Sequence, residues 1–283
     1  APMNHGSVSV YSFAVALAAS AALFVTAPAA FAARVATESV NYFAGDRALR
    51  GYIAYDAERT EPLPIVLVVH DWWGHSRFAR ERARELAEEG FLAMAVDLFG
   101  PGVAPESVAA AQQWADPFLA DRQLFVDTLA PALDVARSHE RADPERAGVV
   151  GYGFGGRAAM ELAMFGTELD AAVAIGNRPG SIDASRARNI TGGVLMIVGS
   201  ADPEVTRARV DAFRDAVDAA DADATLVELT NVQGGFFDPL ADTRRILGVR
   251  YDEQAADLAR RFSREFLVSR LDPPASPDRA DGE

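Results

Sequence analysis

A glycine-rich hexapeptide, residues 151–156 with the sequence GYGFGG, is the segment whose residue types could most directly do chemistry. It follows the apolar run 147–150 and precedes a segment with helical periodicity that begins near Arg157. Its sequence matches the motif G-x-G-x-x-G, which forms the turn that holds the phosphates of a dinucleotide. A position between strand and helix is also typical of the nucleophile elbow of α/β-hydrolases, G-x-(Ser/Cys)-x-G. In that interpretation Gly153 stands where the attacking side chain should project.

The two interpretations differ in what should follow the glycines. A dinucleotide site needs a carboxylate about twenty residues further on, at the end of the next strand, to hold the ribose. Gly176 and Asn177 occupy that place. Two strand and helix units also precede the motif, whereas a dinucleotide turn should open the fold. The elbow is therefore favoured, and a nucleotide-binding domain is kept as an alternative.

The side chains that the chain lacks narrow the chemistry further. Lysine and cysteine are both absent, which excludes Schiff bases, thiol catalysis, disulfides and a P-loop lysine. The four histidines do not stand at metal-ligand spacing, so the sequence predicts neither a metal site nor a cofactor. The formal charge of −14 repels phosphates, so the expected partner is a small molecule and not nucleic acid.

The first 33 residues have the composition of a secretory signal. They contain no Asp, Glu or Arg, residues 13–27 are almost entirely small or apolar, and residues 30–32 (AFA) match an A-x-A cleavage pattern. We therefore expect residues 1–33 to be a signal peptide and the mature protein to be secreted or periplasmic. The alternative is an uncleaved N-terminal membrane anchor, because the apolar stretch is nearly long enough to span about 30 Å of bilayer.

Strand and helix patterns alternate along the rest of the chain. Alternating polarity on both sides of Gly45 predicts an antiparallel hairpin, and continuous apolar runs typical of strands buried on both faces follow. The predicted strands are 39–43, 49–55, 65–69, 93–96, 147–150, 171–175, 194–198 and 225–229, and the predicted helices are 78–89, 104–114, 123–139, 157–165, 206–219 and 255–268.

This alternation predicts an α/β fold of one domain, residues 34–271. Right-handed crossovers between the strands give a mostly parallel, doubly wound sheet with helices on both faces, preceded by the N-terminal antiparallel hairpin. Residues 272–283 are rich in Pro, Asp and Arg and are expected to be a disordered tail.

Five motifs follow one another along the chain in the order found in one known family. They are VLVVHDWWG (66–74), GFLAMAVDLFG (90–100), GYGFGG (151–156), GSADPEV (199–205) and NVQGGFFDP (231–239). Together they resemble the dienelactone hydrolases, α/β-hydrolases that use a Cys, His, Asp triad, over roughly residues 39–267. The resemblance implies the α/β-hydrolase fold, Asp202 as the triad acid, Gly153 at the nucleophile position and Gly234 at the histidine position.

The departures from the family pattern bear most on function. Nucleophile and base are both glycine, and Gly176 stands where many relatives carry another histidine. An enzyme whose triad has lost its nucleophile or base generally accelerates the reaction only about 10³- to 10⁴-fold over the reaction in water. Substrate binding and the oxyanion hole supply this remainder. By resemblance the oxyanion hole uses the backbone N–H groups of Phe154 and Trp72, which do not depend on the lost side chains.

Other residues of the first-strand loop are candidates for the pocket. We expect either that His70 or His75 replaces the missing catalytic base, or that both histidines form only local hydrogen bonds in the loop. Asp71 is a pocket carboxylate or satisfies loop N–H groups, and Trp73 is a pocket wall or a cover of the core. Arg157 binds an anionic ligand or forms a surface salt bridge.

The sequence therefore predicts an exported, dienelactone-hydrolase-like protein that has lost covalent triad hydrolysis and binds a small carbonyl or carboxylate ligand. Whether the chain is an enzyme stays open at this point. The alternative is an active ester or lactone hydrolase in which Asp71, His70 or His75 directs water at the carbonyl.

Overall fold

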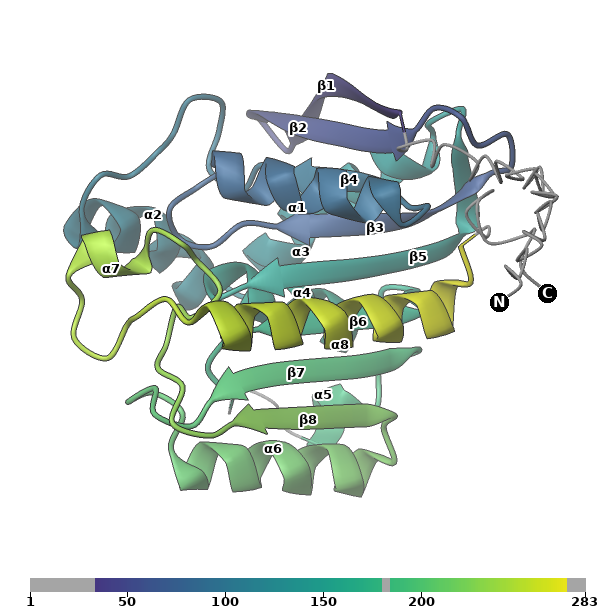
Figure 1. Ribbon diagram of the computed structural model, residues 1–283. Coiled ribbons are helices and arrows are strands. Elements are labelled where there is room, and N and C mark those ends of the chain that lie inside the picture. Colours follow the sequence, from purple (N-terminus) through teal and green to yellow (C-terminus); the bar gives the residue numbers. More distant parts are fainter. Residues whose placement is uncertain (1–33, 180–183, 274–283) are drawn as a thin grey trace, which may run out of the picture. The chain divides into compact units, whose positions relative to one another are not determined.

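An eight-stranded sheet runs through the part of the chain that the computed structural model describes, residues 34–179 and 184–273 (Figure 1). The predicted signal peptide, 1–33, and all but the first two residues of the predicted tail, 272–283, lie outside the described residues. Within the described residues, no helix combines the length and the apolar character needed to cross a membrane.

The strands stand in the order β1-β2-β4-β3-β5-β6-β7-β8. The pairs β1 with β2 and β2 with β4 are antiparallel, and the remaining pairs are parallel. This confirms the predicted hairpin and the mostly parallel, doubly wound sheet. The bounds are β1 Val35–Ala44, β2 Arg47–Asp56, β3 Leu63–Val69, β4 Leu92–Val96, β5 Ala142–Tyr152, β6 Ala171–Ile175, β7 Gly193–Gly199 and β8 Ala224–Leu229.

Helices cover both faces of the sheet, as predicted. Helices α1 and α8 pack on one face, where small side chains such as Ala79, Ala83 and Ala259 let them approach the strands closely. Helices α3, α4 and α6 pack on the other face. The bounds are α1 Arg77–Glu88, α2 Val108–Ala120, α3 Gln123–Arg137, α4 Phe154–Met164, α5 Ala184–Ala187, α6 Arg207–Ala220, α7 Ala241–Arg244 and α8 Glu253–Leu271.

Side-chain caps explain where several helices begin. The hydroxyl of Ser107 accepts a hydrogen bond from the Ala110 N–H at 3.2 Å, and the Asp252 carboxylate accepts one from the Ala255 N–H at 3.0 Å. The cap at Ser107 corrects the prediction of a helix over 104–114, because α2 starts only after it and continues to Ala120. The four-residue helices α5 and α7 were not predicted, since so short a segment shows no periodicity.

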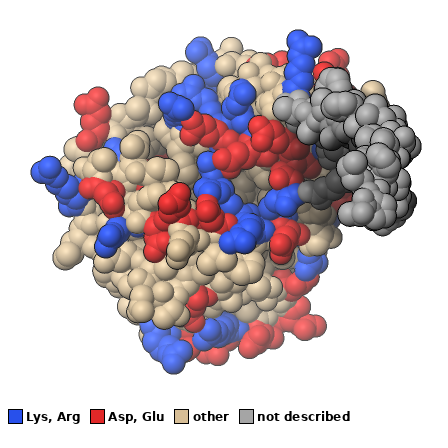
Figure 2. Space-filling view, in the orientation of Figure 1, with Lys and Arg blue, Asp and Glu red and all other residues tan. Residues whose placement is uncertain are grey.

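Arginine and acidic side chains are intermixed on the face that α1 and α8 cover (Figure 2). Arg264 of α8, for example, pairs with Glu89 at the end of α1 at 2.6 Å. On this face the negative net charge is therefore not gathered into one patch.

Candidate functional site

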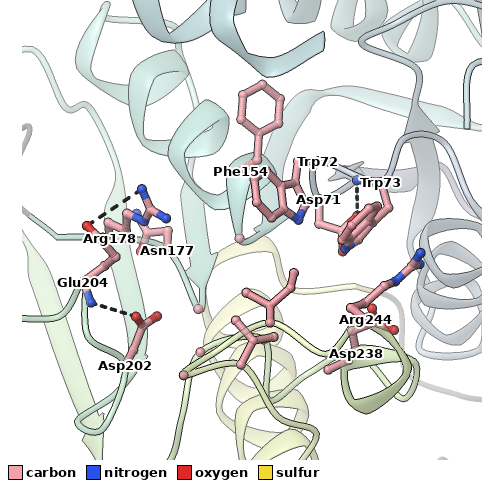
Figure 3. Close-up of a pocket in the computed structure, with 18 of the residues that line it drawn as sticks. Asp71, Trp72, Trp73, Phe154, Asn177, Arg178, Asp202, Glu204, Asp238 and Arg244 are labelled. Atoms are coloured by element: carbon pink, nitrogen blue, oxygen red, sulfur yellow. Dashed lines mark hydrogen bonds and ion pairs between the residues drawn. The ribbon is translucent and has the colours of Figure 1, made fainter. Parts of the chain in front are cut away.

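Loops at the carboxyl ends of the parallel strands enclose a cavity of about 310 Å³. The segments that follow β3, β5, β6, β7 and β8 all contribute to its lining, together with α2 and α7. Ligands of open α/β sheets bind at this edge. Charged side chains stand on two sides of the cavity, with Asp202, Glu204 and Arg178 on one side and Asp71, Asp238 and Arg244 on the other (Figure 3).

Gly153 forms the sharp turn between β5 and α4. Its φ of 53° and ψ of −112° are open to glycine but strained for other residues, and its N–H donates to the Ile175 carbonyl at 2.8 Å. The backbone approaches closely on both sides, since a Cβ on Gly151 would lie 1.9 Å from the Gly155 oxygen and one on Gly155 2.3 Å from the Val69 oxygen. Chain packing at an elbow therefore accounts for these glycines without a bound phosphate.

Asp202 and Gly234 lie directly against each other. A Cβ on Gly234 would stand 2.6 Å from Asp202 Oδ2, while Oδ1 accepts a hydrogen bond from the Glu204 N–H at 2.9 Å. Burial raises the pKa of Asp202, and the hydrogen bond from Glu204 opposes this effect. The structure thus brings Gly153, Gly234 and Asp202 to one cavity, and their catalytic correspondences stay predictions.

The two residues predicted to supply oxyanion donors also line the cavity. Phe154 is the first residue of α4, so its N–H has no acceptor within the helix. Trp72 lies in the turn after β3, and among the described residues no acceptor is found for its N–H. Both amides are therefore free to donate to a ligand oxygen.

Asp71 is a buried carboxyl group at one wall of the cavity. Its Oδ1 accepts a hydrogen bond from the Trp73 N–H at 2.9 Å. Burial raises the pKa of Asp71 to about 7, helped by the nearby Asp238 and opposed by the Trp73 hydrogen bond and by Arg244. Asp71 therefore has both of the roles predicted for it as alternatives: it lines the pocket and it satisfies a loop N–H.

Arg244 faces Asp71 across this wall. Its guanidinium carbon lies 3.9 Å from the centre of the Trp73 ring, and its buried Nε has no hydrogen-bond partner among the described residues. Within the described residues, no carboxylate forms an ion pair with Arg244. The cavity therefore contains a cation held in place by stacking, with its donors unused.

The prediction that His70 and His75 belong to the pocket is wrong, because neither is among the described residues that line the cavity. His70 is fully buried, and its Nε2 accepts a hydrogen bond from the Leu98 N–H at 3.1 Å, so its Nδ1 donates to the Asp71 carbonyl at 2.5 Å. Burial lowers the pKa of His70 to about 4. The neutral ring ties the end of β3 to the end of β4 and has no nitrogen left to act as a base.

Several residues at the cavity were missed from the sequence. Glu204 and Asp238 lie within two of the five motifs, whereas Arg178, in the loop after β6, and Arg244, at the end of the short helix α7, belong to no recognisable motif. Phe237 fills the space beside Gly176, where an added Cβ would lie 2.5 Å from its ring. Within the described residues, no group of three or more His, Cys, Asp or Glu side chains could hold a metal ion.

Comparison with known proteins gives consistent matches. Residues 49–270 match the model of the dienelactone hydrolase family. A Yersinia pestis protein named "Putative carboxymethylenebutenolidase" is 27% identical over 190 residues, covering 63% of this chain and 70% of its own. A protein of the same name from Methylorubrum extorquens is 28% identical over 225 residues, covering 73% and 76%.

The fold also matches that of solved structures. A dienelactone hydrolase-like promiscuous phosphotriesterase from metagenomic libraries superposes with a TM-score of 0.80 at 27% identity, covering 84% of this chain and 99% of its own. These matches support the α/β-hydrolase interpretation of the sheet, and the nucleotide-binding alternative gains no support from them.

Proposed function

The chain belongs to the dienelactone hydrolase family, and from this premise we propose that it binds a small carbonyl- or carboxylate-containing ligand without covalent hydrolysis. The observation that carries the proposal is a cavity whose described lining includes an arginine, Arg244, without a carboxylate partner among the described residues, and includes no hydroxyl, thiol, imidazole or amine group. We further propose that the protein acts after export, on the composition of residues 1–33 alone.

The lining of the cavity supports the loss of covalent chemistry. Among the described residues that form it, none carries a hydroxyl, thiol, imidazole or amine group. An acyl-enzyme needs such a nucleophile and a base to activate it. Asp202 stands at the cavity without an imidazole to orient, which leaves a carboxylate in the position of the triad acid and no triad around it.

The same lining supports binding of a carbonyl and a carboxylate. The N–H groups of Trp72 and Phe154 can donate to a carbonyl oxygen, as in an oxyanion hole. The planar guanidinium of Arg244, fixed against Trp73, presents a fork of donors that fits a carboxylate.

We expect Arg244→Gln to weaken binding of coumalate, a small lactone with a carboxylate, by roughly 10- to 100-fold. A hydrogen bond to a charged group contributes about 1.5–3 kcal/mol, and glutamine cannot replace the charge. Titration calorimetry at pH 7 measures the affinity, with methyl coumalate as the uncharged probe that should be little affected.

Arg214→Gln is the matched control, because Arg214 pairs with Glu228 outside the cavity lining. An Arg244→Gln protein that binds coumalate as tightly as the unmodified protein contradicts the assignment. Turnover of p-nitrophenyl acetate that disappears on Asp202→Ala contradicts the absence of hydrolysis.

Direct attack of water on an ester or lactone is the second candidate, and Asp71 favours it. A general base works best when its pKa is close to the operating pH, and the pKa of Asp71 is raised to about 7. Its Cβ lies 3.7 Å from the position of a Cβ on Gly153, so the vacant nucleophile position is beside the carboxyl group. In this candidate the attacking water molecule stands at that place, next to the base.

This candidate predicts hydrolysis of p-nitrophenyl acetate without a burst, at a rate that rises with pH through about 7 as Asp71 ionises. Asp71→Asn removes the base, so the rise with pH should disappear and the rate should fall by roughly 10²-fold or more. A pH–rate profile of both proteins is the measurement. An Asp71→Asn protein with an unchanged profile eliminates Asp71 as the base.

A further inference from the structure

Leu247 is a large apolar side chain that the fold leaves open to solvent at the cavity. It follows α7, lines the cavity and is 97% exposed. Single exposed leucines are common on protein surfaces and need no explanation. An exposed leucine in the wall of a ligand cavity is different, because a bound molecule can remove its apolar surface from water.

A tight turn fixes the position of Leu247. The Val249 N–H donates to the Ile246 carbonyl at 3.1 Å, which closes the turn around Leu247. Gly248 has a φ of 78°, a value that favours glycine at the third position of a type II turn. Its carbonyl accepts a hydrogen bond from the Gly234 N–H at 2.9 Å. The turn therefore presents Leu247 from a backbone that is anchored at the site.

Helix α2 contributes a second leucine to the same cavity. Gln112, Ala115 and Leu119 are spaced by three and four residues, so they share one face of the helix, and all three line the cavity. Leu119 is 40% exposed. Its apolar surface is therefore accessible to a molecule in the cavity, as that of Leu247 is.

The arginines of the cavity lining other than Arg244 already pair with carboxylates. Arg157 pairs with Glu161 at 3.5 Å, and Arg178 pairs with Glu204 at 3.8 Å. A ligand carboxylate is therefore directed to Arg244, and the rest of the ligand meets the other walls of the cavity.

The surroundings of Leu247 favour the ligand over a protein or lipid surface as its occupant. Its apolar neighbours Ile246 and Val249 line the cavity with it, so its surface is continuous with the cavity wall. A stable protein interface buries about 800 Å² on each partner around an apolar core. Outside the cavity, the exposed side chains of Arg245 and Arg250 interrupt the apolar surface on both sides of the turn. The net charge of −14 disfavours an anionic lipid surface.

We propose that the ligand of this cavity is amphiphilic, with a hydrocarbon group that lies on Leu119 and Leu247 and a carbonyl or carboxylate group at the polar wall. The inference rests on the proposed function in taking the cavity as the ligand site, and it names the ligand class as medium-chain or aryl carboxylic acids and their esters. Leu119 and Leu247 then set the preference for the size of the hydrocarbon group.

Straight-chain carboxylates of increasing length test the apolar subsite. Titration calorimetry of the full chain at pH 7 with butyrate, hexanoate and octanoate should show an affinity that rises by roughly 2- to 4-fold for each added methylene group. Octanoate should therefore bind about 10-fold or more tightly than butyrate. Equal affinities for butyrate and octanoate overturn the proposal, as does the absence of any binding of octanoate and 1-octanol.

Leu247→Asn tests the leucine directly, because a side chain so exposed contributes little to the stability of the fold. It should reduce the ratio of octanoate to butyrate affinity by roughly 3- to 10-fold, and Leu119→Asn should reduce the ratio in the same direction. Leu258→Asn is the matched control, since Leu258 is an exposed residue of α8 outside the cavity lining. A folded Leu247→Asn protein with an unchanged ratio contradicts the subsite, and circular dichroism establishes that each variant is folded.

Alcohols of the same chain lengths separate failure of the apolar subsite from failure of the proposed function. Binding of 1-octanol about 10-fold or more tightly than 1-butanol, lost in Leu247→Asn and without any binding of coumalate, supports the subsite and contradicts the carboxylate assignment. Coumalate binding that depends on Arg244, together with equal affinities for butyrate and octanoate, overturns only the subsite.

Sedimentation velocity tests a second copy of the chain as the rival occupant. We expect the unmodified protein and Leu247→Asn to have the same sedimentation coefficient. An unmodified protein that dimerises and a Leu247→Asn protein that stays monomeric, with equal affinities for butyrate and octanoate, assign Leu247 to an interface between copies and overturn the proposal.

Discussion

Replacing Gly153 by cysteine and Gly234 by histidine together is expected to give a protein that hydrolyses p-nitrophenyl acetate with burst kinetics. The rate should exceed that of the unmodified chain by about 10³-fold or more, because the introduced nucleophile and base should act as a unit with Asp202, the predicted triad acid, and with the predicted oxyanion donors. Stopped-flow detection of p-nitrophenolate measures the burst and the steady rate.

The backbone conformation at both positions can accept the new side chains. At Gly153 an added Cβ would meet Phe237 at 3.3 Å, a contact that a small shift of the ring relieves, and the strained φ of 53° is the geometry of a nucleophile elbow. Cysteine should therefore destabilise the fold by about 1–3 kcal/mol, measurable by chemical denaturation. Gly234 is not among the glycines with positive φ, so histidine can adopt its backbone conformation.

The main rearrangement falls on Asp202. Its Oδ2 lies 2.6 Å from the position of the new Cβ on residue 234, so the carboxylate must rotate away, and it can then accept a hydrogen bond from the imidazole. Each single variant should show no burst, and Asp202→Asn should remove most of the recovered rate. A folded double variant that remains as slow as the unmodified chain contradicts the correspondence of these positions to a triad.

Asp71→Asn is expected to stabilise the folded protein at pH 8 by up to about 4 kcal/mol. The pKa of Asp71 rises from 3.8 to about 7 on folding because the carboxyl group is buried, and each unit corresponds to about 1.4 kcal/mol. Asparagine keeps an acceptor for the Trp73 N–H and never ionises. Guanidinium denaturation of both proteins between pH 4 and 8 measures the difference.

The sign follows from proton binding. Between pH 4 and 7 the folded state holds a proton on Asp71 that the unfolded state has released. The contribution of Asp71 to the stability of the fold is therefore fully present below about pH 4 and is lost as the pH rises through 7. His70 acts in the opposite direction, since its lowered pKa makes the fold lose stability as the pH falls from 6.5 to 4. This contribution is common to both proteins and cancels in their difference.

The stability difference between Asp71→Asn and the unmodified protein should therefore be small near pH 4 and grow up to pH 7. A difference that does not change with pH indicates that Asp71 titrates alike in the folded and unfolded states. Asp46→Asn, at the exposed β1–β2 turn, is the matched exchange of aspartate for asparagine away from the cavity.

The sheet was predictable because its signals are local. The apolar runs of β3, β4 and β6 are buried on both faces, as short uninterrupted runs predict. The helix boundaries were less predictable where a cap and not periodicity decides them, as at Ser107.

The cavity was predictable only in outline. Topology brings the carboxyl ends of the parallel strands to one edge, so Asp71, Gly153 and Asp202 could be assigned to it from the sequence. The two histidines could not be judged in this way. Whether His70 is a base or a structural bridge depends on the approach of Leu98 from the segment after β4, which no local pattern encodes.

The sequence by itself determined what this chain lacks. It contains no cysteine and no lysine, and glycine stands at the two positions predicted to correspond to the triad nucleophile and histidine, so residue identity limits which covalent chemistry is available. Only the tertiary structure decided which charged groups meet at the cavity. Arg244 stacks on Trp73, and Gly248, next to Leu247, packs on Pro203, through contacts between residues far apart in the chain. Desolvation and unsatisfied hydrogen bonding arise from such contacts, so the ligand chemistry could be inferred only after the chain had folded.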